Sequence, residues 1–111
     1  MTTFGAHLRH ERLRAGLGLR ELARRMKSSA SYLSRLETGD ESNPPSEDWI
    51  WRWQRYTLAD IDVTLALSGR IPKWLLAFLS ENPAVQDFLR EMHFANLSAS
   101  DWRKLAKEAK R

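Results

Sequence analysis

The 111-residue chain contains no cysteine, which excludes a disulfide framework and a thiolate metal site. It has no apolar run of about 18 residues and no basic-then-apolar leader, so we expect a cytoplasmic protein that neither spans a membrane nor is exported. No stretch alternates apolar and polar residues, so no strand is predicted. No phosphate-binding glycine loop, no G-x-S-x-G and no nucleophile beside a base is present, so we expect neither an enzyme nor a cofactor.

The composition is that of a globular chain, with 42% hydrophobic and 29% charged residues. Net charge is +4, unevenly distributed: residues 1–37 hold eight Arg and Lys against three acids, residues 38–69 two against six, and residues 70–111 eight against five. The basic surplus of the first segment favours phosphate as a partner. The alternative is that these arginines are simply the solvated faces of helices.

The apolar residues recur at helical spacing throughout, which predicts an all-α protein. Capping residues and helix stops divide the pattern into segments. The expected helices span about 4–15, two short stretches within 19–37, then 46–57 and 60–67, and three more that begin near Pro72, Asn82-Pro83 and Ser98 or Ser100. We expect a first part, residues 1–69, and a C-terminal helical extension, residues 70–111, packed as one domain.

Residues 19–37 have the layout of a helix-turn-helix. Lys27-Ser28 interrupts the helical pattern, and Ser29 offers a hydroxyl to cap the next helix. The apolar residues form one face on each side of the break: Leu22, Ala23 and Met26 before it, Leu33 and Leu36 after it. The opposite face of the second helix carries small polar residues and Arg35, which suits the major groove of duplex DNA.

An ordered set of pieces resembles the Cro/CI-like (XRE) helix-turn-helix regulators over about residues 4–92. These pieces are FGxxLR at 4–9, LRELARR at 19–25, SxSYLSRLExG at 29–39, PPSED at 44–48, LALSGRIP at 65–72 and NPAVQDFLR at 82–90. The resemblance implies a five-helix DNA-binding unit, extended here by about three C-terminal helices. It also implies a bacterial or phage regulator that acts as a homodimer on a palindromic operator, most often as a repressor.

The same resemblance assigns site residues. The expected DNA-binding residues are Arg20, Lys27, Ser29, Ala30, Ser31, Tyr32, Ser34 and Arg35. Arg35 either takes guanine O6 and N7 with its guanidinium fork or clamps a phosphate. Arg12 and Glu37 match positions that form a structural ion pair between the first helix and the end of the recognition helix.

The chain departs from the family pattern in the turn and in the following loop. Lys27 stands where glycine is common, so it would need either a left-handed backbone or a reshaped turn. Ser28 replaces an apolar residue whose side chain, in relatives, usually packs into the core beneath the turn. Asp40 and Glu41 occupy a loop in which relatives often place Arg or Lys against phosphate, and these acids should weaken nonspecific binding.

Several apolar residues lack an obvious place in the DNA-binding unit. Trp51 lies about 200° around its helix from Trp49, on a side that is normally polar, and the C-terminal helices carry further apolar stripes. Either these residues pack within the chain or they form an isologous dimer interface. The candidates for dimerisation are Trp51, Trp74, Leu75, Phe78, Phe88 and Trp102.

His7, His10 and Glu11 form the one metal-like pattern, and we interpret them as exposed helical residues and predict no metal site. The predicted function is a sequence-specific double-stranded DNA-binding transcriptional regulator, a dimeric repressor that reads an inverted repeat with residues 29–37. The alternative is a protein-interaction module, such as an antitoxin or an adaptor that retains the fold. The acidic segment 38–69 and Trp51 favour this alternative.

Overall fold

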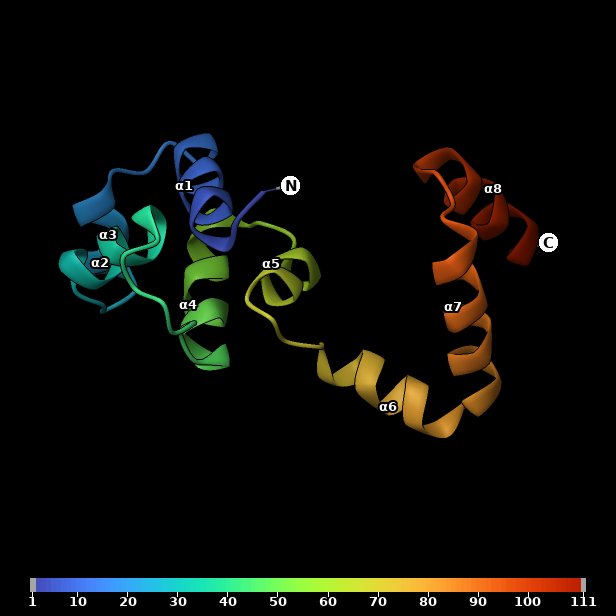
Figure 1. The fold of residues 1–111 in the computed structure, drawn as a ribbon. Helices are drawn as coiled ribbons and strands as arrows, with labels where there is room; N and C mark the ends of the chain where they lie inside the picture. The colour runs from blue at the N-terminus through green and yellow to red at the C-terminus, as the bar shows by residue number, and fades with distance from the viewer. Residues whose placement is uncertain (1, 111) are drawn as a thin grey trace. The chain divides into compact units, whose positions relative to one another are not determined.

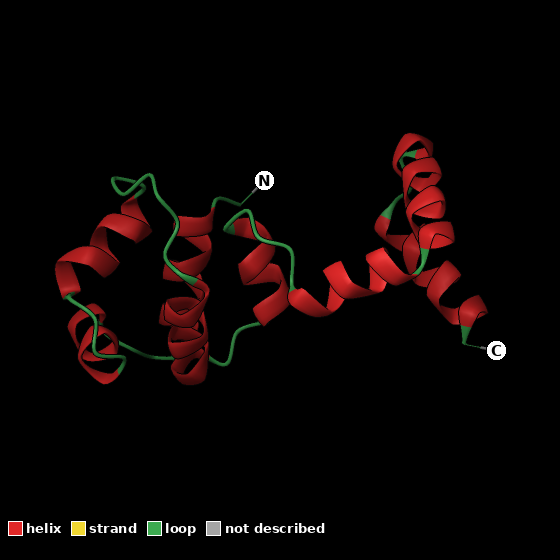
Figure 2. Cartoon of the chain, turned by 90° about the horizontal axis from the view of Figure 1, so that it is seen from below, coloured by secondary structure: helices red, strands yellow, loops and turns green. Residues whose placement is uncertain are grey.

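The computed structural model describes residues 2–110, and this range contains helices and loops but no strand (Figures 1 and 2). The all-α prediction is confirmed, with five helices followed by three more. They are α1 (Phe4–Arg14), α2 (Leu19–Arg25), α3 (Ala30–Thr38), α4 (Glu47–Thr57), α5 (Ile61–Leu67), α6 (Lys73–Glu81), α7 (Pro83–Ala95) and α8 (Ala99–Ala109). The chain separates into two compact units, one ending at Pro72 and the other beginning at Lys73.

Side-chain caps begin most helices of the first unit, because the first backbone N–H groups of a helix have no partner within it. The predicted cap of α3 is confirmed, since Ser29 Oγ accepts from Tyr32 N at 3.0 Å. Ser46 caps α4 in the same way, since its Oγ accepts from Trp49 N at 3.1 Å. Gly39, at φ 87°, ends α3 in the left-handed conformation that its lack of a side chain allows.

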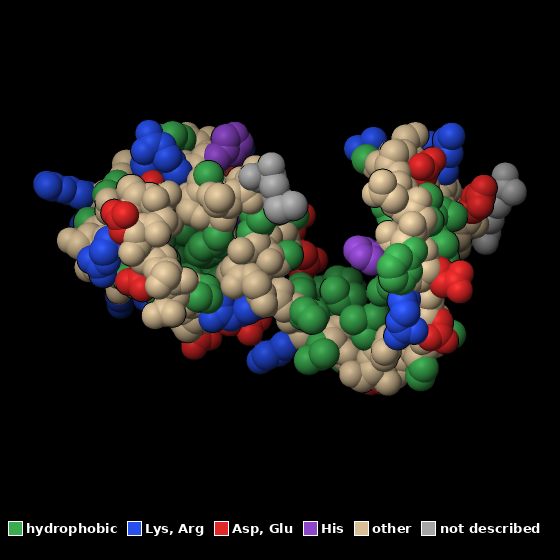
Figure 3. Space-filling model, in the orientation of Figure 1, with side chains coloured by type: hydrophobic (Ala, Val, Ile, Leu, Met, Phe, Trp, Pro, Cys, Tyr) green, Lys and Arg blue, Asp and Glu red, His purple; other side chains and the backbone are tan. Residues whose placement is uncertain are grey.

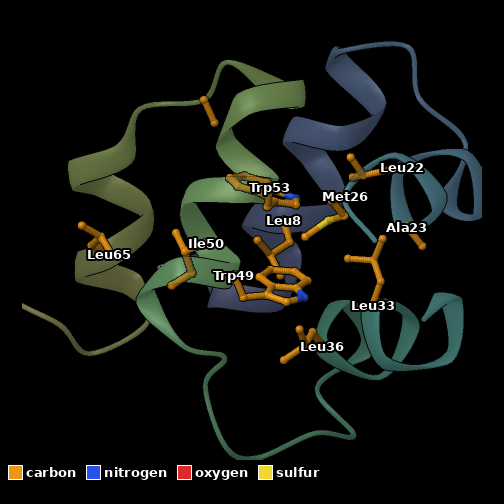
Figure 4. Packing of buried hydrophobic residues seen from close by; sticks show 11 residues of the cluster. Leu8, Leu22, Ala23, Met26, Leu33, Leu36, Trp49, Ile50, Trp53 and Leu65 are labelled. Atoms are coloured by element: carbon orange, nitrogen blue, oxygen red, sulfur yellow. The ribbon is translucent and has the colours of Figure 1, made fainter. Parts of the chain in front are cut away.

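The hydrophobic core of the first unit is built from all five of its helices (Figure 4). Helix α1 packs on α3, α4 and α5, while α2 packs on α3 and α4. The apolar faces predicted on the two sides of the turn are buried as expected, and the buried face of α4 carries Trp49, Ile50 and Trp53. The full core comprises Leu8, Leu22, Ala23, Met26, Leu33, Leu36, Trp49, Ile50, Trp53, Ala59 and Leu65.

Gly5 allows α1 to approach the end of α3 more closely than any other residue would. A Cβ at this position would collide with the backbone oxygen of Leu36 and would lie 2.7 Å from that of Glu37. Both obstacles are backbone atoms that cannot rotate away. The first turn of α1 therefore requires glycine where it crosses α3.

The expectation that His7 is exposed is wrong. Its side chain is buried between α1 and α5, and its Nε2 lies 2.8 Å from Thr64 Oγ1. The Thr64 hydroxyl already donates to Asp60 O at 2.8 Å, so the imidazole must be the donor to Thr64. Burial lowers the pKa of His7, an effect opposed by the carboxylate of Glu11 and, more weakly, by that of Asp60. Among residues 2–110 there is no group of three or more His, Cys, Asp or Glu that could hold a metal ion.

The second unit contains α6, α7 and α8, and none of the described residues in these helices is buried. Helix α8 begins with a capping box between Ser98 and Asp101. Hydrophobic side chains gather over α6 and α7 (Figure 3). The exposed large ones are Trp74, Leu76, Phe78, Phe88, Leu89, Phe94 and Trp102. No helix within residues 2–110 combines the length and the apolar character needed to cross a membrane.

Candidate nucleic-acid interface

The turn between α2 and α3 has the first of the two backbones expected for it. Lys27 has φ 55°, so it adopts the left-handed conformation without being glycine. The N–H of Ser28 donates back to Ala23 O at 2.9 Å, which closes the turn on the end of α2. Because a side chain in this conformation costs about 1 kcal/mol or more, surrounding contacts must hold the turn in place.

Two side chains of α4 supply such contacts. Trp49 Nε1 donates to Ser28 Oγ at 3.0 Å, so the hydroxyl that replaces an apolar plug serves as the acceptor for a buried indole. Arg52 Nη1 donates to Met26 O at 2.7 Å, which satisfies a carbonyl at the end of α2. Neither contact was predicted from the sequence. The polar Ser28 at a position that is usually apolar, together with a tryptophan-rich helix later in the chain, could have indicated the first of them.

The ion pair that the resemblance implies between Arg12 and Glu37 is present in the structure. Arg12 Nε and Nη2 donate to the two carboxylate oxygens of Glu37 at 2.8 and 3.0 Å. Arg12 Nη1 donates to Leu17 O at 2.9 Å. Since both side chains are nearly inaccessible to solvent, this pair ties α1 to the last turn of α3 and fixes the orientation of α3.

The solvent side of α3 carries the side chains expected to face DNA. Ser31 and Arg35 are exposed, while Ala30 and Ser34 are half-buried. These four residues line one shallow depression together with Arg20 and Leu19 from the start of α2. The structure thus brings five of the eight expected DNA-binding residues to one surface.

The other three expected DNA-binding residues lie outside this depression. Lys27 and Ser29 are exposed in the turn, at the N-terminal end of α3. Tyr32 is half-buried, and its ring lies edge-on to Trp49 with 5.9 Å between the ring centroids. Arg35 extends over the Tyr32 ring, with its Cζ 5.8 Å from the ring centroid. The Tyr32 ring therefore makes a cation–π contact with Arg35 and also packs on α4.

The acidic loop after α3 meets this surface at Arg35. Glu41 Oε2 lies 3.8 Å from Arg35 Nε, and the N–H of Glu41 donates to Arg35 O at 3.1 Å. Asp40 is engaged differently, because its Oδ2 accepts from the Thr38 hydroxyl at 3.1 Å. Lys and Arg side chains lie over the α2 and α3 end of the first unit (Figure 3).

Comparison with known proteins agrees with this geometry. A family model described as a helix-turn-helix domain matches residues 3–66. The crystal structure of the clp gene regulator ClgR from Corynebacterium glutamicum is similar, with 26% identity, a TM-score of 0.51 and coverage of 84% of this chain and 89% of that one. The structure of a SinR protein/SinI protein complex is similar in fold, with 19% identity, a TM-score of 0.54 and coverage of 97% and 95%. No curated protein matches the chain. The chain belongs to the helix-turn-helix domain family and is a DNA-binding transcriptional regulator of the Cro/CI-like (XRE) type.

Proposed function

We propose that the protein is a dimeric repressor that reads an inverted repeat in double-stranded DNA with α3. The observation that carries the proposal is the exposed face of α3, on which short side chains surround Arg35 in a single depression with Arg20. Small residues allow a helix to enter the major groove closely, and a guanidinium can then take O6 and N7 of guanine together.

The turn that precedes α3 supports contacts to the DNA backbone. Lys27 and Ser29 are exposed beside the N-terminal end of α3, where unpaired backbone N–H groups and the helix dipole favour a phosphate. Arg20 adds a positive charge at the start of α2. We propose phosphate contacts for these three residues and base contacts for Ala30, Ser31, Ser34 and Arg35, with Tyr32 as the support of Arg35. A protein that binds the genome would act in the cytoplasm, on the nucleoid.

The second unit supports the dimer. Three helices in which no described residue is buried gain little hydrophobic stabilisation by themselves, since each large side chain contributes only when it leaves water. We propose that a second copy covers its apolar faces in an isologous interface. Five of the six expected dimerisation residues, Trp51, Trp74, Phe78, Phe88 and Trp102, are exposed in the chain, and Leu75 is half-buried.

Sedimentation equilibrium tests this interface. Phe88→Ser should shift the protein from dimer to monomer, because it removes an aromatic side chain from the apolar stripe of α7. Arg90→Ser is the matched control, since Arg90 lies about 200° further around the same helix and makes only an exposed ion pair with Asp87. A wild-type monomer at concentrations at which it binds DNA would refute the dimer.

Equilibrium binding to a duplex selected from random sequence tests the DNA-binding site. Binding should weaken steeply as salt rises, because phosphate contacts release counterions. Arg35→Ala should reduce affinity by about 1–3 kcal/mol, the range of a bidentate base contact. Arg55→Ala is the control, because Arg55 is an exposed arginine on α4 and lies outside the depression. Equal effects of the two substitutions would contradict the assignment of α3 as the reading helix.

A second candidate function is that of a protein-interaction module, such as an antitoxin or an adaptor. The observation that favours it is Trp51, which is 49% exposed on α4 within the acidic segment. The SinR protein, which is similar in fold, was solved as a complex with the SinI protein. If this function held, Ala30, Ser31 and Arg35 could be replaced without loss of activity, whereas Trp51→Ser would abolish partner binding.

A further inference from the structure

Glu41 contacts the arginine that the proposed function assigns to base reading, although it lies in the loop and not on α3. Its Oε2 is 3.8 Å from Arg35 Nε, and its backbone N–H donates to Arg35 O, so the loop is fixed to the last turn of the recognition helix. The Glu41 side chain is 25% exposed, compared with 48% for Arg35. The carboxylate is thus held in place while the guanidinium remains accessible.

We propose that Glu41 is a specificity-determining residue, which orients Arg35 toward guanine and away from phosphate. This inference rests on the proposed function. The carboxylate forms an ion pair with the Nε side of the guanidinium, at 3.8 Å. Within residues 2–110 neither terminal nitrogen of Arg35, Nη1 or Nη2, donates a hydrogen bond. These two nitrogens form the fork that can donate to O6 and N7 of one guanine.

Two contacts restrict the guanidinium from different sides. The Tyr32 ring lies beneath it, with Arg35 Cζ 5.8 Å from the ring centroid, and Glu41 lies at its Nε edge. An arginine restricted in this way loses less side-chain entropy when it binds a base. The Glu41 charge also repels DNA phosphates near Arg35, which disfavours the competing position as a phosphate clamp.

The proposal predicts opposite effects of Glu41 on affinity and on discrimination. Glu41→Gln removes a negative charge that faces DNA, so binding to an unrelated duplex should tighten by about three- to tenfold at low salt. Preference for the guanine should fall by about tenfold, because Arg35 can then turn toward phosphate. A residue that merely stabilised the loop would not loosen specificity and tighten nonspecific binding together.

Asp40→Asn provides the matched control. It removes the same charge from the neighbouring position of the same loop, but Asp40 pairs with Thr38 and not with Arg35. Fluorescence anisotropy at constant salt would measure the affinity for three duplexes. The first is the selected duplex, and the second differs from it only at the guanine pair whose recognition is lost in Arg35→Ala. The third is a duplex of unrelated sequence. Asp40→Asn should tighten binding to all three duplexes by the same factor. Only Glu41→Gln should reduce the ratio of the affinity for the first duplex to the affinity for the second.

The double variant Arg35→Ala/Glu41→Gln tests whether Glu41 acts through Arg35. Relative to Arg35→Ala, it should tighten all three duplexes equally, as Asp40→Asn does. The inference is overturned if Glu41→Gln keeps the wild-type ratio, or if it lowers the ratio equally in the absence of Arg35. A wild-type protein that selects no sequence would overturn the proposed function itself, whereas selective binding with an unchanged Glu41→Gln ratio overturns only the role of Glu41.

Discussion

Replacement of Arg12 by methionine should be among the most destabilising single changes in the first unit. The Arg12 guanidinium donates three hydrogen bonds, two to the Glu37 carboxylate and one to Leu17 O. Methionine fills similar space but donates none of them. The Glu37 side chain, only 4% exposed, would then keep a negative charge without a partner and largely out of reach of water.

The expected cost follows from that uncompensated charge. Breaking a buried ion pair by removing one partner costs about 3–5 kcal/mol, a large part of the roughly 5–15 kcal/mol that stabilises an ordinary domain. Replacing both members by apolar residues removes the charge as well as its partner. Arg12→Met/Glu37→Leu should therefore recover most of the loss and retain about 1–2 kcal/mol, which includes the unpaired carbonyl of Leu17.

Urea denaturation followed by tryptophan fluorescence measures these free energies of unfolding, because Trp49 and Trp53 lie in the core. Arg25→Met is the control: the Arg25–Glu21 pair is similarly short, at 2.7 Å, but its side chains are 46% and 40% exposed, so its loss should cost about 0.5 kcal/mol or less. The reasoning is refuted if Arg12→Met costs no more than Arg25→Met, or if the double variant is as unstable as the sum of its single variants.

Three further changes probe the fold around the reading helix. Gly5→Ala should destabilise the protein by about 2 kcal/mol or more in thermal denaturation, because the new Cβ meets fixed backbone oxygens of α3. Gly18→Ala is the control in the same measurement, because a Cβ at that position meets nothing within 4 Å. Burial lowers the pKa of His7 below its ordinary 6.5, so the unfolded state binds more protons than the folded state. The free energy of unfolding should therefore fall as pH drops below about 6.5. A His7→Gln variant whose stability declines equally steeply between pH 7 and pH 5 would show that another group is responsible. Lys27→Gly should raise the free energy of unfolding by about 0.5 kcal/mol, since relief of the left-handed side chain outweighs the added entropy of the unfolded chain, and a loss of stability would contradict this account of the turn.

Local features of the fold were predictable because they depend on residues close in the chain. Ser29 and Ser46 cap their helices through N–H groups three residues away. Lys27 adopts the left-handed conformation, one of the two alternatives expected at its position in the turn. The buried face of α4 agrees with the helical period, since Trp49 and Trp53 are about one turn apart, and the family resemblance indicates that this face is buried.

The remaining features depend on pairs of residues far apart in the sequence. Burial of His7 depends on a contact with Thr64, 57 residues away, and the sequence of the first helix does not predict this contact. Arg52 was indistinguishable from a solvated arginine until the structure placed it 2.7 Å from Met26 O. Glu41 was recognisable as an unusual acid, but its pairing with Arg35 depends on how the loop folds back over α3.

Selection of binding sites from random duplex DNA, carried out in parallel with the wild-type protein and Arg35→Ala, tests the central claim most directly. We expect the wild-type protein to enrich an inverted repeat whose half-site centres lie about one turn of DNA, roughly 34 Å, apart. Arg35→Ala should enrich the same repeat with one guanine pair lost from each half-site. Failure of the folded wild-type protein to enrich any sequence at low salt would contradict the claim that α3 reads DNA.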